Sequence, residues 1–196
     1  MQEAEDRLSF FPSVNCDSRL GNPLLLPGPV PGNPVAMRQF TTIAQWDAYL
    51  KTLRLSGTPP GLLQRDYEHM LRVLALAWWE APVIKLAELA ALARLETAIT
   101  LRYPGKKFRG LESAMQHLIQ SNNVSNSDLR TYRESGGAIV ENLLLDRKSP
   151  RGTSLSEIRN RLAHGDPFET MPWAGLFEVV RDLIDFMYPP STAAVS

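Results

Sequence analysis

The sequence predicts an all-α protein, a helical bundle preceded by a Pro/Gly-rich N-terminal arm. Apolar residues recur at helical spacing in successive stretches after residue 39. No stretch alternates convincingly between apolar and polar residues, as a half-buried strand would. The chain has 196 residues, of which 44% are hydrophobic. That length and composition fit one folded domain with an appendage.

Residues 1–38 differ in composition from the rest of the chain. Five prolines and three glycines lie between Gly21 and Val35. Because proline lacks a backbone N–H and fixes its own φ, we expect this segment to form neither a helix nor a strand ladder. We interpret residues 1–38 as an extended or partly disordered arm. The alternative is a strap that docks on a partner through Leu24, Leu25 and Leu26.

Residues 39–190 are expected to form the helical domain. The predicted helices cover 42–55, 62–79, 83–103, 111–120, 128–145, 154–164 and 172–188. The Ala/Leu-rich stretch 83–103 is apolar on most sides, which predicts a central buried helix. Gly136 and Gly137 predict an interruption or bend within 128–145. Residues 191–196 form a tail of mostly small residues.

Charge and cysteine content narrow the function classes. Lys+Arg and Asp+Glu number 21 each, so a globally basic nucleic-acid binder is excluded, although a local basic patch is not. The single Cys16 excludes an internal disulfide framework and a Cys-rich zinc site. No secretory signal or apolar stretch of the ~20 residues that a membrane span needs is recognisable. We therefore expect a cytoplasmic protein with no membrane association.

The predicted helix 154–164 is well delimited at both ends. Ser154-Leu155-Ser156-Glu157 matches a capping box, in which the Ser side chain accepts the third helical amide and the Glu side chain reaches back. Gly165 suits the left-handed backbone that commonly ends a helix. The sequence therefore predicts a short, sharply bounded helix.

One face of this helix is polar. At about 100° per residue, Asn160 and His164 project opposite the apolar ridge, and Arg159 and Arg161 flank them. Ala163 lies on the same side and is small enough to let another surface approach. The ridge that we expect to face the core is formed by Leu155, Ile158 and Leu162.

Residues 146–164 also carry a local excess of positive charge. The five basic residues exceed the two acids, although the whole chain is neutral. Phosphate suits such a face, because Arg offers fork-shaped donors and His exchanges protons near neutral pH. The same arrangement of residues can also occur without a function. The polar residues would then be ordinary exposed residues, and the His would be stabilised by the negative end of the helix.

The sequence RNRLAH at 159–164 resembles the signature of the HEPN superfamily, in which an Arg is followed by a polar residue, three more residues and a His. The setting is similar too, because the family's motif lies late in a helical bundle and shortly before a final apolar helix. The stretches LETAITLRYPG and GLESAMQHLI resemble the family's earlier core helices. The resemblance covers roughly 84–188 and implies a HEPN-like helical bundle.

The resemblance implies a metal-independent endoribonuclease that needs no cofactor and acts as a homodimer. In the family, the motif helices of two protomers face each other and form one composite site. His164 would be the general base or acid for attack of the RNA 2′-hydroxyl on the adjacent phosphorus. Arg159 would position the scissile phosphate and offset developing charge. Asn160 would orient the His or bind the phosphate.

Further residues are candidates for supporting roles. Arg161, Arg151 and Lys148 are basic residues that we expect to contact the RNA backbone. Glu96 lies in the middle of the apolar stretch 83–103, where a buried carboxylate needs a partner. It either pairs with a motif Arg or lies partly exposed on its helix.

Two other features are weaker candidates. The chain's three His residues lie on separate segments without ligand spacing, so no metal site is predicted. The run 102–109 interleaves four basic residues with two aromatic residues, a pattern that suits single-stranded RNA. We interpret it as a solvated loop between helices.

We therefore expect a ribonuclease of the toxin or host-defence type, restrained by an antitoxin or another regulatory protein because free RNase activity harms the cell. The alternative is a non-catalytic HEPN-like module that binds RNA, a nucleotide or a protein, or that dimerises. A third reading is a helical interaction protein with an accidental motif. The joint presence of Arg159, Asn160 and His164 favours the enzyme.

Overall fold

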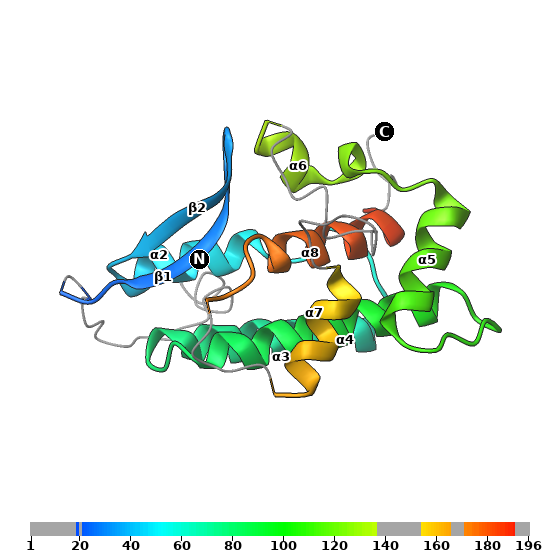
Figure 1. Cartoon of the computed structure of the whole chain (residues 1–196), viewed down its shortest axis with the longest axis horizontal. Helices are drawn as coiled ribbons and strands as arrows, with labels where there is room; N and C mark the ends of the chain where they lie inside the picture. Colours follow the sequence, from blue (N-terminus) through cyan, green and yellow to red (C-terminus); the bar gives the residue numbers. More distant parts are fainter. Residues whose placement is uncertain (1–18, 20, 137–153, 166–170, 191–196) are drawn as a thin grey trace, which may run out of the picture.

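The computed structural model of the chain describes residue 19 and residues 21–136, 154–165 and 171–190. In this part the protein is mostly helical and carries one two-stranded antiparallel sheet (Figure 1). The strands are β1 (Leu24–Val30) and β2 (Asn33–Phe40). The helices are α2 (Ile43–Thr52), α3 (Gly61–Ala75), α4 (Val83–Arg102), α5 (Leu111–Asn122), α6 (Arg130–Glu134), α7 (Leu155–Ala163) and α8 (Leu176–Met187). Two short 3-10 turns are η1 (Leu76–Trp78) and η2 (Asn126–Asp128).

Helix α4 is the centre of the core, as its apolar composition predicts. It packs against α3, α5, α7 and α8. Ala91, Leu92 and Leu95 in its middle are completely buried. In Figure 1, α8 lies above α4, and α2 and the β1–β2 hairpin lie at the left of the view. The expectation of a central buried helix over 83–103 is confirmed.

The hairpin corrects the prediction of an all-α fold. Residues 24–40 form a paired ladder, so the expectation that Pro and Gly prevent one between Gly21 and Val35 is wrong. In a two-stranded sheet both strands are edge strands, where proline is tolerated. Pro27 pairs with Met37, and Pro29 lies at an irregularity of the register between Gly28 and Val30. The predicted arm boundary near residue 38 falls inside β2.

The hairpin is fastened to the helices by apolar packing and by one ion pair. Leu24 and Leu26 are buried within the protein itself. Of the three leucines considered for docking on a partner, only Leu25 is exposed. Arg38 of β2 forms an ion pair with Glu178 of α8. A side chain at Gly28 would collide with the guanidinium of Arg38. The glycine therefore leaves room for the Arg38 side chain to cross the hairpin.

Several predicted helix boundaries move, among them the end of the predicted helix 42–55, which lies at Thr52. The stretch 62–79 forms α3 up to Ala75 and continues as the 3-10 turn η1 to Trp78. Helix α6 ends at Glu134, and Gly136 then adopts a φ of 72°, in keeping with the predicted interruption. Residues 137–145 of that prediction lie outside the described residues. The predicted start at residue 172 is wrong, because Gly175 adopts a φ of 73° and α8 begins at Leu176.

No helix in the described part of the chain combines the length and the apolar character needed to span a membrane. Residues 1–18 of the predicted arm and the tail 191–196 lie outside the described residues.

Candidate functional site

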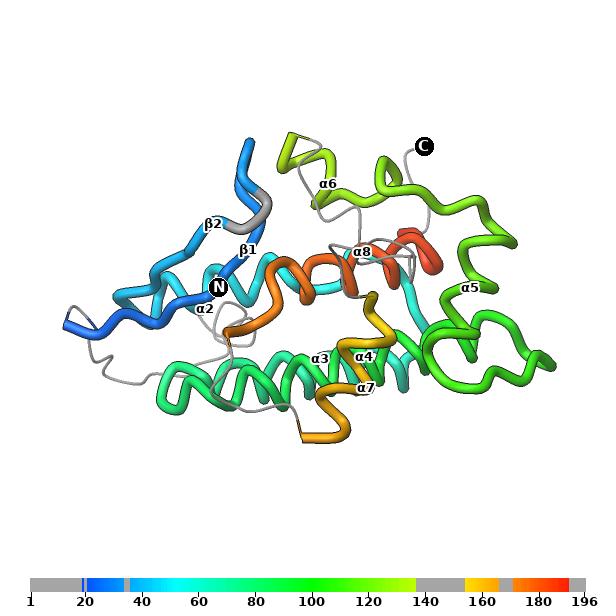
Figure 2. The backbone as a smooth tube through the Cα atoms, viewed as in Figure 1, coloured from blue at the N-terminus to red at the C-terminus, as the bar shows by residue number. Residues whose placement is uncertain are grey.

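Helix α7 is anchored at both ends and along one face. The Ser154 side chain accepts the amide of Glu157, and the Glu157 carboxylate accepts the Ser154 amide, so the predicted capping box forms. Gly165 follows the helix with a φ of 86°, as predicted. Leu155 and Ile158 are buried, and α7 packs across α4 and α5 (Figure 2). The polar face of α7 is thereby turned away from its own core.

The polar residues of the motif lie on that outer face. Asn160, Arg161, Ala163 and His164 are exposed, and Arg159 is half-buried. His164 ends the helix, and its backbone N–H donates to the carbonyl oxygens of Asn160 and Arg161. The arrangement expected from the helical spacing is therefore found, with the imidazole at the end of a fixed helix.

Glu96 of α4 lies beside the motif arginine. The distance from Arg159 Nε to Glu96 Oε2 is 3.9 Å, and the two side chains are 38% and 28% exposed. Arg159 also donates a long hydrogen bond of 3.5 Å to the side-chain oxygen of Asn160. Both alternatives considered for Glu96 therefore hold, because it pairs with a motif Arg and remains partly exposed. A contact of this length between partly exposed groups orients Arg159 more than it stabilises the fold.

Arg161 has a partner that the sequence did not reveal. Its guanidinium carbon lies 5.2 Å from the centroid of the Trp173 ring, a cation–π distance. The Trp173 backbone N–H donates to the carboxylate of Glu88, which is fully buried on α4. Glu88 forms an ion pair of 3.1 Å with Lys85, which is also buried. A Lys and a Glu three residues apart near the start of an Ala/Leu-rich helix were the signal that could have indicated this buried pair.

The remaining predicted phosphate contacts cannot be placed. Arg151 and Lys148 lie outside the described residues, as does Arg147. Within the described residues the positive charges of the site are therefore Arg159 and Arg161, and Arg159 is partly neutralised by Glu96.

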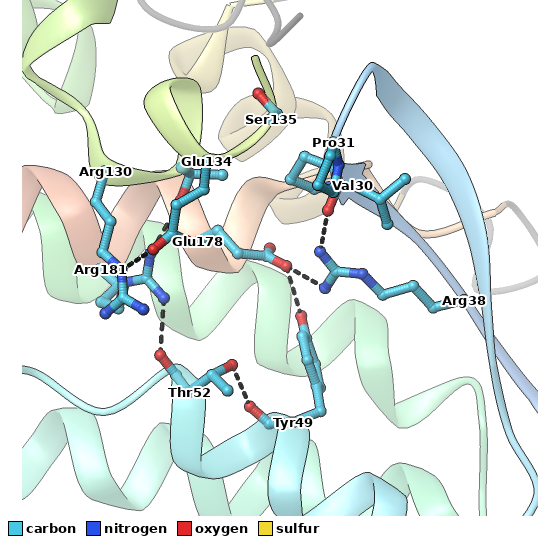
Figure 3. A pocket seen from close by; sticks show the side chains of 12 residues that line it. Val30, Pro31, Arg38, Tyr49, Thr52, Arg130, Glu134, Ser135, Glu178 and Arg181 are labelled. Carbon is cyan, nitrogen blue, oxygen red and sulfur yellow. Dashed lines mark hydrogen bonds and ion pairs between the residues drawn. The ribbon is translucent and has the colours of Figure 1, made fainter. Parts of the chain in front are cut away.

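A separate cavity lies between the hairpin, α2, α6 and α8 (Figure 3). Its volume is about 410 Å³, and its lining includes Arg38, Tyr49, Glu178 and Arg181. Glu178 accepts from Arg38 and from the hydroxyl of Tyr49, the latter at 3.2 Å. No residue of the α7 motif lines this cavity.

The charges around this cavity are paired with one another. Arg181 donates to both Asp182 Oδ1 and the carbonyl oxygen of Thr52, the latter at 2.7 Å. Burial disfavours the charge on Arg181, but the charge of and hydrogen bond to Asp182, with smaller contributions from Tyr67 and Glu178, together outweigh burial and raise the pKa of Arg181. Burial, with a contribution from Glu178, raises the pKa of Tyr49 well above its usual value. We interpret the role of this network as structural: it holds the hairpin and α6 against α8.

The run 102–109 is packed onto α5 by its aromatic residues. The rings of Tyr103 and Phe108 lie 4.7 Å and 5.5 Å from the ring of His117. The basic residues of the run are exposed. This arrangement fits the interpretation of a solvated loop, and the structure adds the two rings that anchor it on α5.

In the described ranges, no group of three or more His, Cys, Asp or Glu side chains is arranged to hold a metal ion. No protein-family model, curated protein or solved structure matches the chain.

Proposed function

We propose that the protein is a metal-independent endoribonuclease of the HEPN type, whose active site forms between the α7 helices of two protomers. The observation that carries the proposal is the placement of Arg159, Asn160 and His164. They lie on the outer face of a helix that is fixed by a capping box, a glycine exit and a buried ridge. Such anchoring fixes the backbone from which the three side chains project, and a rigid element of this kind suits a catalytic site.

The chemistry follows from the three side chains. His164 takes the proton from a ribose 2′-hydroxyl as that oxygen attacks the neighbouring phosphorus. The bond from phosphorus to the 5′-oxygen breaks, and this oxygen receives a proton. The products are a 2′,3′-cyclic phosphate and a 5′-hydroxyl. Arg159 binds the phosphate and offsets the charge that develops on it, and Asn160 orients the imidazole or the phosphate.

The exposure of this face supports a composite site. A general base acts best where water is excluded, and His164 is exposed in the single chain. Apposition of two α7 faces across a twofold axis would cover both imidazoles and bring two Arg and two His into one cleft. Ala163, exposed beside His164, leaves room for that approach.

RNA is the substrate, and a toxin or host-defence RNase in the cytoplasm would be restrained by an antitoxin or regulatory protein.

The test compares RNA cleavage by the full chain with that by His164→Ala and Arg159→Ala, using labelled structured and single-stranded RNA in EDTA. We expect each variant to lose about a hundredfold or more in rate, because a general acid–base group and a charge-stabilising group each contribute that much. His117→Ala is the matched control, since His117 lies on α5 against Tyr103. It should cleave at the wild-type rate.

Two outcomes would contradict the proposal. Full activity of both variants at unchanged oligomeric state would remove the site assignment. RNA binding without cleavage by the wild type, lost on Arg159→Ala, would instead assign the non-catalytic RNA-binding module. Thermal unfolding of each variant shows whether the fold is intact.

A further inference from the structure

The contact between Arg161 and Trp173 joins α7 to a segment that precedes α8. The guanidinium carbon of Arg161 lies over the indole ring at 5.2 Å. The ammonium nitrogen of Lys85 also lies over this ring, at 5.9 Å. Trp173 itself is half-buried. One indole therefore contacts a cation from the motif helix and a cation from the central helix.

A buried ion pair on α4 fixes the position of Trp173. Lys85 and Glu88 pair at 3.1 Å, and their side chains are 2% and 0% exposed. Glu88 accepts the backbone N–H of Trp173, and Lys85 donates to the carbonyl oxygen of Met171 at 2.8 Å. A buried ion pair is costly to desolvate and adds little net stability. What this pair does provide is a defined location for residues 171–173 beside α7.

We infer that Trp173 is a positioning residue that holds the Arg161 guanidinium on the motif face, where Arg161 binds an RNA phosphate next to the one that is cleaved. A cation–π contact uses the face of a guanidinium, whereas a phosphate is bound by the N–H groups in its plane. The same side chain can therefore stack on Trp173 and bind an anion. Arg161 and His164 are three residues apart on α7 and project in neighbouring directions. This inference rests on the proposed function.

The test measures the cleavage kinetics and the salt dependence of RNA binding for Arg161→Ala, Trp173→Leu and the double variant. Loss of one phosphate contact should lower the slope of log affinity against log salt concentration by about 0.7 for single-stranded RNA. We expect Trp173→Leu to raise KM about two- to fivefold, as loss of one partly exposed cation–π contact does, with kcat nearly unchanged. The double variant should be no weaker than Arg161→Ala alone, because both changes remove the same contact.

Two control variants separate positioning from general damage. Trp173→Phe keeps an aromatic face and should retain most of the wild-type affinity. Trp79→Leu removes an exposed tryptophan at the end of η1 and should leave KM and the salt slope unchanged. Equal effects of Trp173→Leu and Trp79→Leu would overturn the inference, and so would additive effects in the double variant.

A readout without RNA makes failure of the inference distinguishable from failure of the proposed function. The ring current of Trp173 should shift the NMR signal of Arg161 Nε–H in the free protein, and Trp173→Leu should abolish that shift. Absence of the shift overturns the inference even if RNA is cleaved. If the shift is present but the wild type neither binds nor cleaves RNA, the proposed function fails and the assigned role of Trp173 fails with it.

Discussion

Arg159 and His164 lie about 1.4 turns apart on α7, yet the described part of the chain holds them differently. Arg159 has Glu96 at 3.9 Å and Asn160 at 3.5 Å. Among the described residues, the side chain of His164 has no hydrogen-bond or ion-pair partner. In the proposed composite site, a second protomer or RNA would therefore have to orient the imidazole, whereas Glu96 and Asn160 already contact the arginine.

Glu96→Gln tests how much of that orientation comes from the carboxylate. Because the pair is partly exposed, the free energy of unfolding should change by less than about 1 kcal/mol. RNA cleavage should fall by no more than about fivefold, the rate equivalent of one such pair. Glu134→Gln is the control, since it removes the carboxylate of the exposed pair with Arg130 on α6. A hundredfold loss in Glu96→Gln at unchanged stability would instead give Glu96 a direct catalytic role.

Two buried tyrosines predict how stability depends on pH. Burial raises the pKa of Tyr49, with a contribution from Glu178, and burial also raises the pKa of Tyr67. In the unfolded chain both hydroxyls ionise near pH ~10, so above that pH the unfolded state loses protons first. The stabilisation is complete below pH ~10 and is lost as the pH rises further. Tyrosinate absorbance should therefore show these two residues ionising only together with alkaline unfolding. Their reversible ionisation in the folded protein would contradict the assignment.

At the scale of the elements, α7 was predictable because its signals are local. The capping box begins at Ser154, the exit glycine is Gly165, and the ridge of Leu155 and Ile158 is read from spacing alone. Each signal depends only on residues within one or two turns. The polar face of α7 could therefore be predicted from the sequence. Because this face makes up most of the candidate site, most of the site was predicted too.

The hairpin and the Trp173 contact were not predictable in that way. The prolines of β1 argue against a strand until it is known that each strand is an edge, and Arg38 finds Glu178 across 140 positions of sequence. Likewise Trp173 contacts Arg161 in the tertiary structure, where α7 packs on α4. Contacts between distant residues carry no local periodicity. The sequence could suggest the buried pair Lys85–Glu88 but not the residues that it holds.

The loop between α2 and α3 supplies a test of packing at the level of elements. A Cβ at Gly57 would lie 1.8 Å from the carbonyl oxygen of Tyr188, at the end of α8. The backbone of this loop also donates to that oxygen, through Thr58 at 3.0 Å. Gly57→Ala must push the loop off α8 and should cost about 2 kcal/mol or more of unfolding free energy.

Gly61→Ala is the matched control for that substitution. Gly61 is the first residue of α3, and a Cβ there meets nothing within 4 Å. Alanine should leave stability unchanged or raise it by about 0.5–1 kcal/mol, because it restricts the unfolded chain. Urea unfolding of both variants measures the difference. Equal stability of Gly57→Ala and Gly61→Ala would show that the loop does not approach α8 closely.

At the scale of the whole molecule, the proposed composite site requires a homodimer joined through the polar faces of α7. Ala163→Arg places a long charged side chain on that face, and we expect it to abolish dimerisation and RNA cleavage together. Ala44→Arg on α2 is the control, because Ala44 is also an exposed helical alanine. Sedimentation equilibrium measures the oligomeric state. A dimer that survives Ala163→Arg would place the interface elsewhere.

The proposed reaction is tested most directly by the chemical identity of the ends of RNA cleaved by the full chain in EDTA. Attack by the 2′-hydroxyl under His164 predicts a 2′,3′-cyclic phosphate on one fragment and a 5′-hydroxyl on the other, both absent when His164→Ala is assayed beside the wild type. Mass spectrometry of the fragments distinguishes these ends from all others. Fragments with 3′-hydroxyl and 5′-phosphate ends, cleavage abolished by EDTA, or equal cleavage by both proteins would contradict the account.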